Sequence, residues 1–543
     1  MMNHKQRISA CVLAILAAAP VLAQHEDHVA GQPQGGKFGS VKFPTSCSAA
    51  AQVQFEQALA MLHSFFYPAT LKAFEAVIKT DPQCAIAYWG LAMAQPPNPL
   101  VPPFDEAALK RGSDAVEKGL ALGPKTERER DWLLAAEAFY KDYDKVPQSQ
   151  RTSAYEHAMA RLTQKYPGDS EAAIFYALAL NEAAPPSDKT YANQLKAAAI
   201  LEKIYREQPD HPGIAHYLIH SYDYSPLAQR GLPFADKYAQ IAPAAPHAVH
   251  MPSHIYSMLG MWAASVRSNE AALKVMREEA ARSWPGATHP SAPHSWDFME
   301  YAYLQLGQDA RARQVRDDAD AATKFPFDRL VTYTGLEAVP ARYALERGAW
   351  QEAAALEPRG SRWPQAEAIT YFARALGCAR GGKADMAQTN IDMLTQLRAK
   401  LEQSGQPYWA EQVQVQILAA SAWLAHAQGK DEDALKQMRA AADLEDGSEK
   451  NVAMENRLYP MREQLGEMLL DLKRPADALK EYEASMQATP NRLRGLYGAA
   501  TAADLAQDRQ KAKLYYGKLV VLTRDADTAR PEVRQAKLYL DRH

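Results

Sequence analysis

Two pairs of histidines, each with three residues between its members, are the most chemically informative feature of this 543-residue chain. The first pair is His216 and His220, and the second is His250 and His254. Residues i and i+4 of a helix lie one turn apart on the same face, so each pair would present two imidazoles side by side. Such a pair can chelate one metal ion, as it does in helical zinc sites. The pairs recur at an interval of 34 residues (250 − 216 = 34).

A shared metal site would need the two histidine pairs to converge. Packed helices lie ~8–10 Å apart, and a metal ion needs imidazole nitrogens at roughly 2.0–2.1 Å. We predict a transition-metal site that includes His216, His220, His250 and His254, on a surface that curves around the ion. Imidazole suits zinc, copper, iron or nickel, and residue types alone do not choose among them. The competing interpretation is that the imidazoles bind a carboxylate or a peptide backbone, or stack on neighbouring aromatic rings.

The elements that must position these histidines are helices. From Ala49 onward apolar residues recur at helical spacing, without convincing strand runs. Near the C-terminus a spaced set of apolar and small residues and one proline is found: Leu465, Gly466, Leu469, Ala478, Tyr482 and Pro490. Through these residues the chain resembles the tetratricopeptide-repeat (TPR) superfamily, whose unit is a 34-residue helix hairpin. It implies an all-α fold, a right-handed α-solenoid of stacked TPR-like helix hairpins.

Small residues between the helices of each hairpin place further repeats along the chain, at Gly260, Gly307, Gly348, Gly382 and Gly429. We therefore expect irregular TPR-like repeats over residues 46–205, central repeats with the histidines over 206–330, and C-terminal repeats over 331–543. The run from Leu62 to Tyr67, together with Asp81 to Trp89, also resembles an exported bacterial TPR family that has no established activity to carry over.

The TPR resemblance also implies which side chains face the concave groove of the solenoid. The register gives twelve groove positions, and besides the two histidine pairs they include five residues that could bind a ligand: His247, His294, Asp297, Tyr301 and Asp223. We assign Asp297 to the metal ligands and the other four to the ligand-binding groove, where Asp223 could also orient an imidazole. With His247, His294 and Asp297 added, the ligand set is large enough for two ions. Histidine is concentrated in this register, although the whole chain has only 15.

The N-terminus has the features of an export signal. Lys5 and Arg7 precede an apolar stretch, and residues 21–23 end in a small residue suited to cleavage. We predict that residues 1–23 are a signal peptide, cleaved after Ala23, and that the mature protein is periplasmic or secreted. Residues 24–45 begin with polar residues and continue as a Gly- and Gln-rich segment, which predicts a flexible tail.

Two cysteines precede the first two expected repeats at corresponding turns. Such turns lie on one edge of a solenoid, so Cys47 and Cys84 are predicted to form a disulfide in an oxidising compartment. Cys378 lies in an Ala-rich helical run and is interpreted as a buried small residue.

Composition narrows the classes of function. A net charge of −3 and the lack of a basic stripe with interleaved aromatics argue against nucleic acid as a partner. No stretch predicts a membrane span, and no phosphate loop or nucleophile elbow is present. We expect the groove to bind an unidentified protein, peptide or small molecule through a histidine-rich, metal-bearing site. The alternatives are a metal-free protein- or peptide-binding TPR scaffold, and a metal-dependent hydrolase or oxidase using the same residues. Whether the protein is an enzyme stays open.

Overall fold

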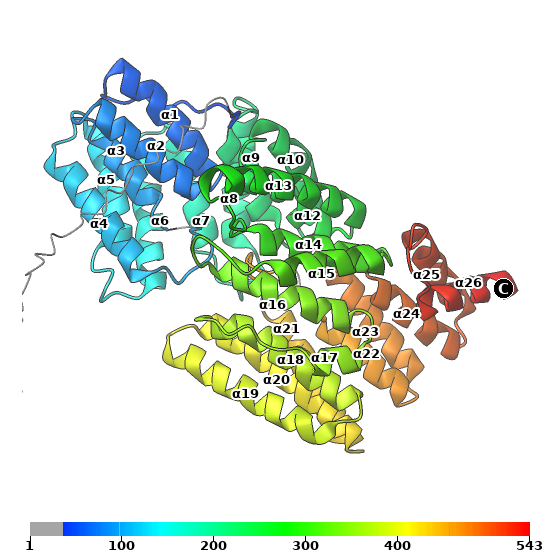
Figure 1. Cartoon of the computed structure of the whole chain (residues 1–543). Helices are drawn as coiled ribbons and strands as arrows, with labels where there is room; N and C mark the ends of the chain where they lie inside the picture. The colour runs from blue at the N-terminus through cyan, green and yellow to red at the C-terminus, as the bar shows by residue number, and fades with distance from the viewer. Residues whose placement is uncertain (1–35, 97, 456) are drawn as a thin grey trace, which may run out of the picture. The chain divides into compact units, whose positions relative to one another are not determined.

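The computed structural model describes residues 36–96, 98–455 and 457–543, and this part of the chain contains helices and no strand. The fold is an all-α solenoid of stacked TPR-like helix hairpins (Figure 1). The predicted signal peptide and residues 24–35 of the predicted tail lie outside the described residues. The N-terminal helices are α1 (Ala49–His63), α2 (Tyr67–Thr80), α3 (Ile86–Met93), α4 (Glu106–Ala121), α5 (Glu127–Tyr140), α6 (Gln148–Lys165), α7 (Ser170–Glu182) and α8 (Ala192–Tyr205).

Several helices begin where a side chain accepts a hydrogen bond from an unpaired backbone N–H of the first turn, or where a proline removes one such N–H. Ser48, Thr126 and Asp169 each accept a hydrogen bond from a backbone N–H in the first turn of the helix that follows. The helices that carry the histidine pairs start instead with a proline, whose missing N–H costs nothing at that position.

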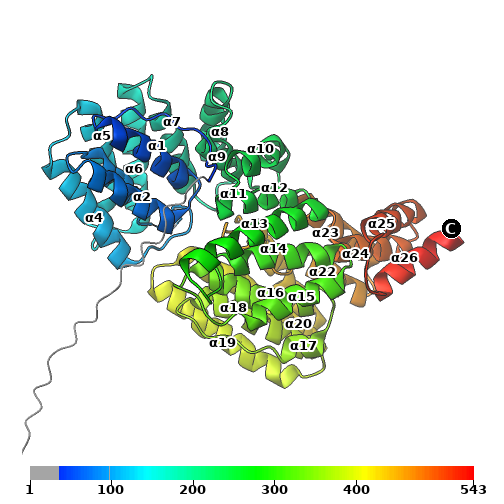
Figure 2. The same ribbon diagram turned by 45° about the horizontal axis from the view of Figure 1, so that its top comes forward.

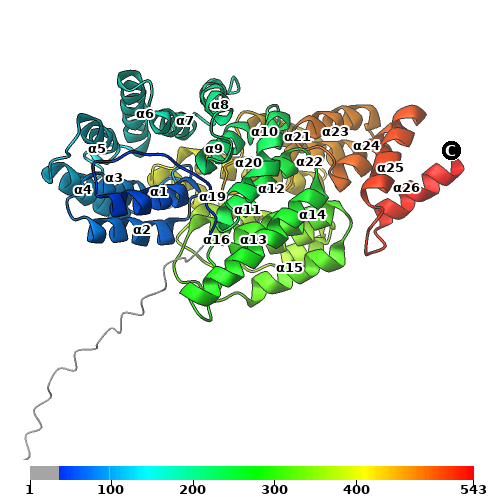
Figure 3. The same cartoon turned by 90° about the horizontal axis from the view of Figure 1, so that it is seen from above.

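The central helices bring the histidines together. They are α9 (Pro212–Tyr222), α10 (Ala228–Ile241), α11 (Pro246–His250), α12 (Pro252–Met258), α13 (Trp262–Ser283), α14 (Ala292–Gln305) and α15 (Asp309–Ala321). The second histidine pair spans a break between α11 and α12, whereas its i, i+4 spacing predicts one continuous helix. Pro252 causes the break because it lacks an N–H and its ring would clash with the preceding turn. In Figures 2 and 3, α9, α11, α12 and α14 lie next to one another.

The C-terminal helices complete the solenoid. They are α16 (Leu330–Leu345), α17 (Trp350–Ala354), α18 (Pro364–Arg380), α19 (Ala384–Gln403), α20 (Pro407–Ala427), α21 (Asp431–Asp446), α22 (Met461–Asp471), α23 (Pro475–Ala488), α24 (Leu493–Leu505), α25 (Arg509–Leu522) and α26 (Pro531–Arg542). Successive first helices pack on one another, as α16, α18 and α20 do.

The glycines that register the repeats occupy the expected turns. Gly260, Gly307, Gly348, Gly382 and Gly429 all have positive φ angles, between 64° and 79°. This left-handed conformation suits glycine because it has no Cβ. Gly498 shows the second role of small residues: a Cβ there would lie 2.1 Å from the ring of Tyr482. The tyrosine therefore fills the space that the glycine leaves between adjacent hairpins.

The central repeats also contact the C-terminal repeats, which closes part of the expected groove. α14 packs against α24 (Figure 1). Trp262 Nε1 donates to the carbonyl of Asn491 at 2.7 Å, and the buried guanidinium of Arg492 donates to the hydroxyl of Tyr301 in α14. These contacts therefore cover part of the inner surface of the solenoid, so that it belongs to the protein interior instead of an open groove.

Two predictions concern the start of the described chain. Phe38, Val41 and Phe43 are buried in the N-terminal core. The predicted flexible tail is therefore wrong for residues 36–45, because these apolar side chains are covered by the first helices.

The structure joins Cys47 and Cys84 by a disulfide, with Cα atoms 4.9 Å apart. Cys378 is a buried free thiol. Among the described helices, none combines the length and apolar character needed to cross a membrane.

Candidate metal centre

Six histidines from three neighbouring hairpins form two groups of three. His216 and His220 of α9 meet His247 of α11, and His250 of α11 and His254 of α12 meet His294 of α14. We call these groups triad one and triad two. Within each triad the ligand atoms all lie within 4.8 Å of one another. The sequence predicted both histidine pairs as metal ligands, with His247 and His294 as groove residues that could join them, and the structure brings these six imidazoles together in two groups.

Triad one is built around His216. Its Nε2 atom lies 3.0 Å from Nε2 of His220 and 3.0 Å from Nε2 of His247. On the other side of the ring, Nδ1 lies 2.6 Å from the carbonyl oxygen of His63. That carbonyl is available because His63 is the last residue of α1, where helix carbonyls have no intrahelical partner. A carbonyl can only accept, so Nδ1 of His216 carries the proton and its Nε2 carries a lone pair.

In triad two, hydrogen bonds fix the orientations of two of the three rings, those of His250 and His254. Nδ1 of His254 donates to Oδ2 of Asp223 at 2.8 Å. Nδ1 of His250 lies 2.7 Å from Oδ1 of Asn269. The amide of Asn269 cannot be turned around, because its Nδ2 donates to the carbonyl of Ser265 at 2.9 Å. Both Nδ1 atoms therefore carry protons, and both Nε2 atoms carry lone pairs.

The two Nε2 atoms of His250 and His254 face each other at 3.2 Å. With both protons held elsewhere, neither nitrogen can donate to the other, and two lone pairs point into one space. A cation between them removes this repulsion. In triad one, the single lone pair of His216 faces two nitrogens and accepts a good hydrogen bond from only one. His216, His250 and His254 thus present the unprotonated Nε2 atoms that a metal ion requires.

Burial keeps these imidazoles neutral. Desolvation lowers the pKa of His250 to about 4. It also lowers the pKa of the other five well below the usual 6.5, with neighbouring cationic or imidazole groups adding to the effect: His216, His220, His247, His254 and His294. At neutral pH each ring therefore keeps the lone pair needed to bind a metal.

Each triad is covered by one phenylalanine. Phe65, at the turn after α1, has its ring centroid 4.4 Å from that of His216 and 5.4 Å from that of His247. Phe298 of α14 lies 4.8 Å from His250 and 4.7 Å from His254 by the same measure. The apolar rings limit the access of water and lower the local dielectric.

A third cluster shows what a structural arrangement of the same residue types looks like. His63, Glu171 and His211 also gather within ligand distance. Here Nε2 of His63 lies 2.9 Å from one oxygen of Glu171, and Nε2 of His211 lies 2.8 Å from the other. The carboxylate accepts both imidazole protons, so no lone pairs are left facing one another. We interpret this cluster as a support for His63, whose carbonyl holds His216.

A long connection between α21 and α22 reaches the centre from the C-terminal repeats. Lys450 pairs with Asp223 at 3.1 Å, and the backbone N–H of Glu455 donates to Asp297 at 3.4 Å. Oδ1 of Asp297 is 2.6 Å from Nε of Arg342. The predicted role of Asp297 as a metal ligand is thus corrected: it belongs to neither triad, because the buried carboxylate is paired with a buried guanidinium.

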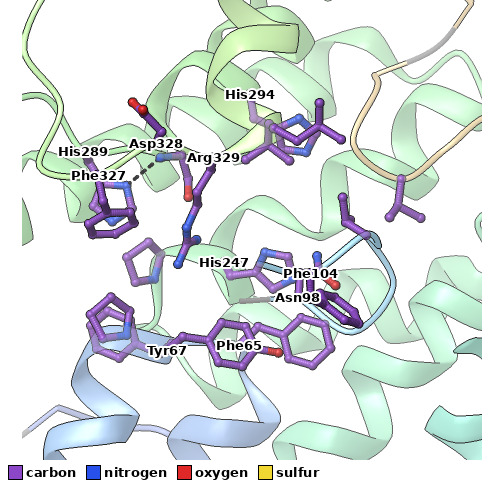
Figure 4. Close-up of a pocket in the computed structure, with 18 of the residues that line it drawn as sticks. Phe65, Tyr67, Asn98, Phe104, His247, His289, His294, Phe327, Asp328 and Arg329 are labelled. Carbon is purple, nitrogen blue, oxygen red and sulfur yellow. Dashed lines mark hydrogen bonds between the residues drawn. The ribbon is translucent and has the colours of Figure 1, made fainter. Parts of the chain in front are cut away.

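A cavity of about 880 Å³ adjoins both triads, and its lining includes His220, His247, His250, His254 and His294. Figure 4 shows His247 and His294 beside this space, with Phe65 and Tyr67 along one wall and Phe327 and His289 on another. Arg329 extends into the space between them (Figure 4). The volume falls in the range of small-molecule sites, about 300–1,000 Å³.

The two remaining residues predicted to face the groove, Asp223 and Tyr301, lie in different surroundings. Asp223 orients an imidazole as predicted, that of His254 in the next repeat, but it does not line the cavity, so its predicted place in the ligand groove is wrong. Tyr301 is buried against Arg492 and does not line the cavity, so its predicted place in the ligand groove is wrong. The contact between central and C-terminal repeats covers it.

Sequence reasoning missed several supporting residues: Phe65, Phe298, Asn269, Lys450 and the carbonyl of His63. Phe65 and His63 lie in the run from Leu62 to Tyr67, which in the sequence indicates only a family resemblance and no role at the site. Phe298 follows His294 by one helical turn, a spacing that could have placed it on the same face. No local pattern connects Asn269 or Lys450 to the histidines, because the fold brings them there from other elements.

Comparison with solved structures finds other helical proteins at low identity. The human IFIT1 dimer with m7Gppp-AAAA has a TM-score of 0.38 and 14% identity, over 81% of this chain and 90% of that one. An IFIT1 monomeric mutant with Gppp-AAAA gives a TM-score of 0.35 and 13% identity, with the same coverage. The human IFIT1 dimer with PPP-AAAA gives 0.34 and 11%, again with that coverage. No family model and no curated protein matches the sequence.

Proposed function

We propose that this protein is an exported TPR solenoid that binds two transition-metal ions, one on each histidine triad. The observation that carries this proposal is the pair of Nε2 atoms of His250 and His254. They lie 3.2 Å apart, and the Nδ1 protons of both rings are held by Asp223 and Asn269. A buried site with converging lone pairs is stabilised by a cation, and imidazole suits zinc, copper, iron or nickel.

The cavity beside the triads is the place where a ligand would meet the metals. Its volume of about 880 Å³ suits a small molecule or a few residues of a peptide, rather than the surface of a folded partner. Aromatic rings form much of its lining, and Arg329 supplies a positive charge. A ligand recognised through the metals and this cavity fits the arrangement better than a metal-free scaffold, because five of the six histidines are buried and only His247 is half-buried.

The test is the metal content of the purified protein after gentle metal loading and desalting, measured by elemental analysis. We expect about two equivalents in the wild type and about one in each paired variant, His216→Ala/His220→Ala and His250→Ala/His254→Ala. His157→Ala is the matched control, because its side chain is 66% exposed on α6 and belongs to neither triad. Circular dichroism checks that each variant folds. Less than about a tenth of an equivalent in the wild type contradicts the proposal.

A further inference from the structure

We infer that the two triads hold a pair of copper(I) ions and that this pair binds dioxygen between them. The inference rests on the proposed metal sites and names the metal and the small molecule that they would take. Three independent features carry it: the charge of the ligand set, the number of ligands per ion, and the juxtaposition of the triads.

The ligand set has no negative charge. All six members are imidazoles, and neither triad includes a carboxylate or a thiolate. Asp223, the carboxylate that contacts His254, is itself compensated, since it pairs with Lys450 at 3.1 Å. Two divalent ions would bring four uncompensated positive charges into a buried site, and two copper(I) ions only two. Because burying charge is costly, the ligand set favours the monovalent ion.

The number of ligands points the same way. Zinc in protein sites takes four ligands, so each triad would need an added water or anion to complete the ion. Copper(I) is satisfied by three nitrogen donors in a plane. Phe65 and Phe298 cover the triads with apolar rings, which suits an ion that keeps no water. Each ion would be open only on the side that its own triad does not occupy.

The two triads adjoin each other across a short gap. The ring centroids of His220 and His254 are 6.4 Å apart, as are those of His247 and His250. These four residues also line the cavity from which a small molecule would enter. Two ions held on such neighbouring triads would both be within reach of one diatomic molecule.

Binding of dioxygen to this pair balances in electrons and charge. Each copper(I) gives up one electron and becomes copper(II), and dioxygen takes both electrons to become a bridging peroxide. The O–O bond remains as a single bond, two Cu–O contacts form, and no proton is required. The total charge of metals and bound oxygen stays at two positive, since four positive charges then face a dianion. The neutral site therefore accommodates both states equally in charge.

The experiment loads the metal-free full-length mature protein with copper(I) under anaerobic conditions, and in parallel with zinc(II). After desalting, air-saturated buffer is added. We expect about two copper ions per chain and the uptake of one dioxygen molecule per copper pair. An intense near-ultraviolet band should appear, with an O–O vibration that shifts with isotopically heavy dioxygen. The oxygenated protein should give no copper signal in electron paramagnetic resonance, because the two copper(II) spins couple.

Matched variants separate the possible failures. His250→Ala/His254→Ala should keep about one copper ion, on triad one, and lose all dioxygen uptake. His157→Ala should behave as the wild type. If two copper ions bind without dioxygen uptake, or oxidation gives the signal of isolated copper(II), the inference is overturned while the proposed metal sites stand. Binding of zinc but not copper(I) has the same meaning. Binding of neither metal overturns the proposed function itself.

Discussion

Oδ2 of Asp223 accepts a hydrogen bond from Nδ1 of His254 at 2.8 Å and also contacts Nζ of Lys450 at 3.1 Å. The aspartate follows α9, the histidine lies in α12, and the lysine comes from the connection after α21. One carboxylate thus links the triads to the C-terminal repeats. It also fixes the proton of His254 on the side away from the other imidazoles, which leaves Nε2 free to bind a metal.

Replacing Asp223 by asparagine should weaken metal binding at triad two. The neutral amide makes His254 a weaker base and leaves the ammonium of Lys450 without its partner, so we expect affinity to fall about 10–100-fold. Chelator competition measures it. Asp431→Asn is the matched control, because Asp431 contacts Nδ1 of His426 at the same 2.8 Å on the protein surface. Equal affinity in Asp223→Asn and the wild type would show that this hydrogen bond does not support the site.

The stability of the metal-free protein should depend on pH through the triads. Burial lowers the folded-state pKa of all six histidines, to about 4 for His250. Below the unfolded value of about 6.5 the unfolded chain therefore binds more protons than the folded one, and the free energy of unfolding falls as pH falls. Urea unfolding measured from about pH 7 to about pH 5 should show this decrease. The variant with both His pairs replaced by alanine should show a shallower one. A flat profile in the wild type would mean that these imidazoles are not buried as neutral groups.

Packing between the last hairpins depends on the absence of a side chain at Gly498. A Cβ there would lie 2.1 Å from Tyr482, so Gly498→Ala should lower the free energy of unfolding by about 1–3 kcal/mol. Gly517→Ala is the control within α25, where a Cβ would meet no atom within 4 Å. It should raise stability by about 0.5–1 kcal/mol, because alanine favours helix. Denaturant unfolding compares the two, and equal effects would contradict this packing account. Metal content should be unchanged in both.

The N-terminal sequence predicts that the protein is exported and that its signal peptide is removed. If residues 1–23 are a signal peptide, the protein recovered from a periplasmic or culture fraction should begin at Gln24. Intact-mass measurement of that fraction checks the N-terminus. Lys5→Glu/Arg7→Glu should reduce export, because the positive end of the signal is lost. A full-length chain confined to the cytoplasmic fraction would contradict the prediction.

The repeats could be predicted from the sequence because their determinants are local. Gly260 and Gly307 lie at the turns where a left-handed residue is needed, and Tyr482 meets the glycines that the TPR pattern places beside it. The i, i+4 spacing of each histidine pair likewise placed its two rings on one face. Periodicity and turn chemistry therefore fixed the helices and the general position of the site.

The composition of the two triads depended on contacts that no local pattern encodes. His247 joins the pair on α9, while His250 and His254 meet His294. Asp297 shares a helix face with His294, yet Arg342 from α16 takes its carboxylate. The burial of Tyr301 depends on Arg492, which lies 191 residues later in the chain. Tertiary contacts of this kind decided which groove residues join the histidine triads.

Anomalous X-ray diffraction from crystals of the metal-loaded protein tests the central claim most directly. Data collected at the absorption edge of the loaded metal should show two peaks. One should lie roughly 2.0–2.1 Å from imidazole nitrogens of His216, His220 and His247, and the other at the same distance from those of His250, His254 and His294. Peaks only at other positions, or no peak at either triad in fully loaded crystals, would contradict the assignment of these six histidines as metal ligands.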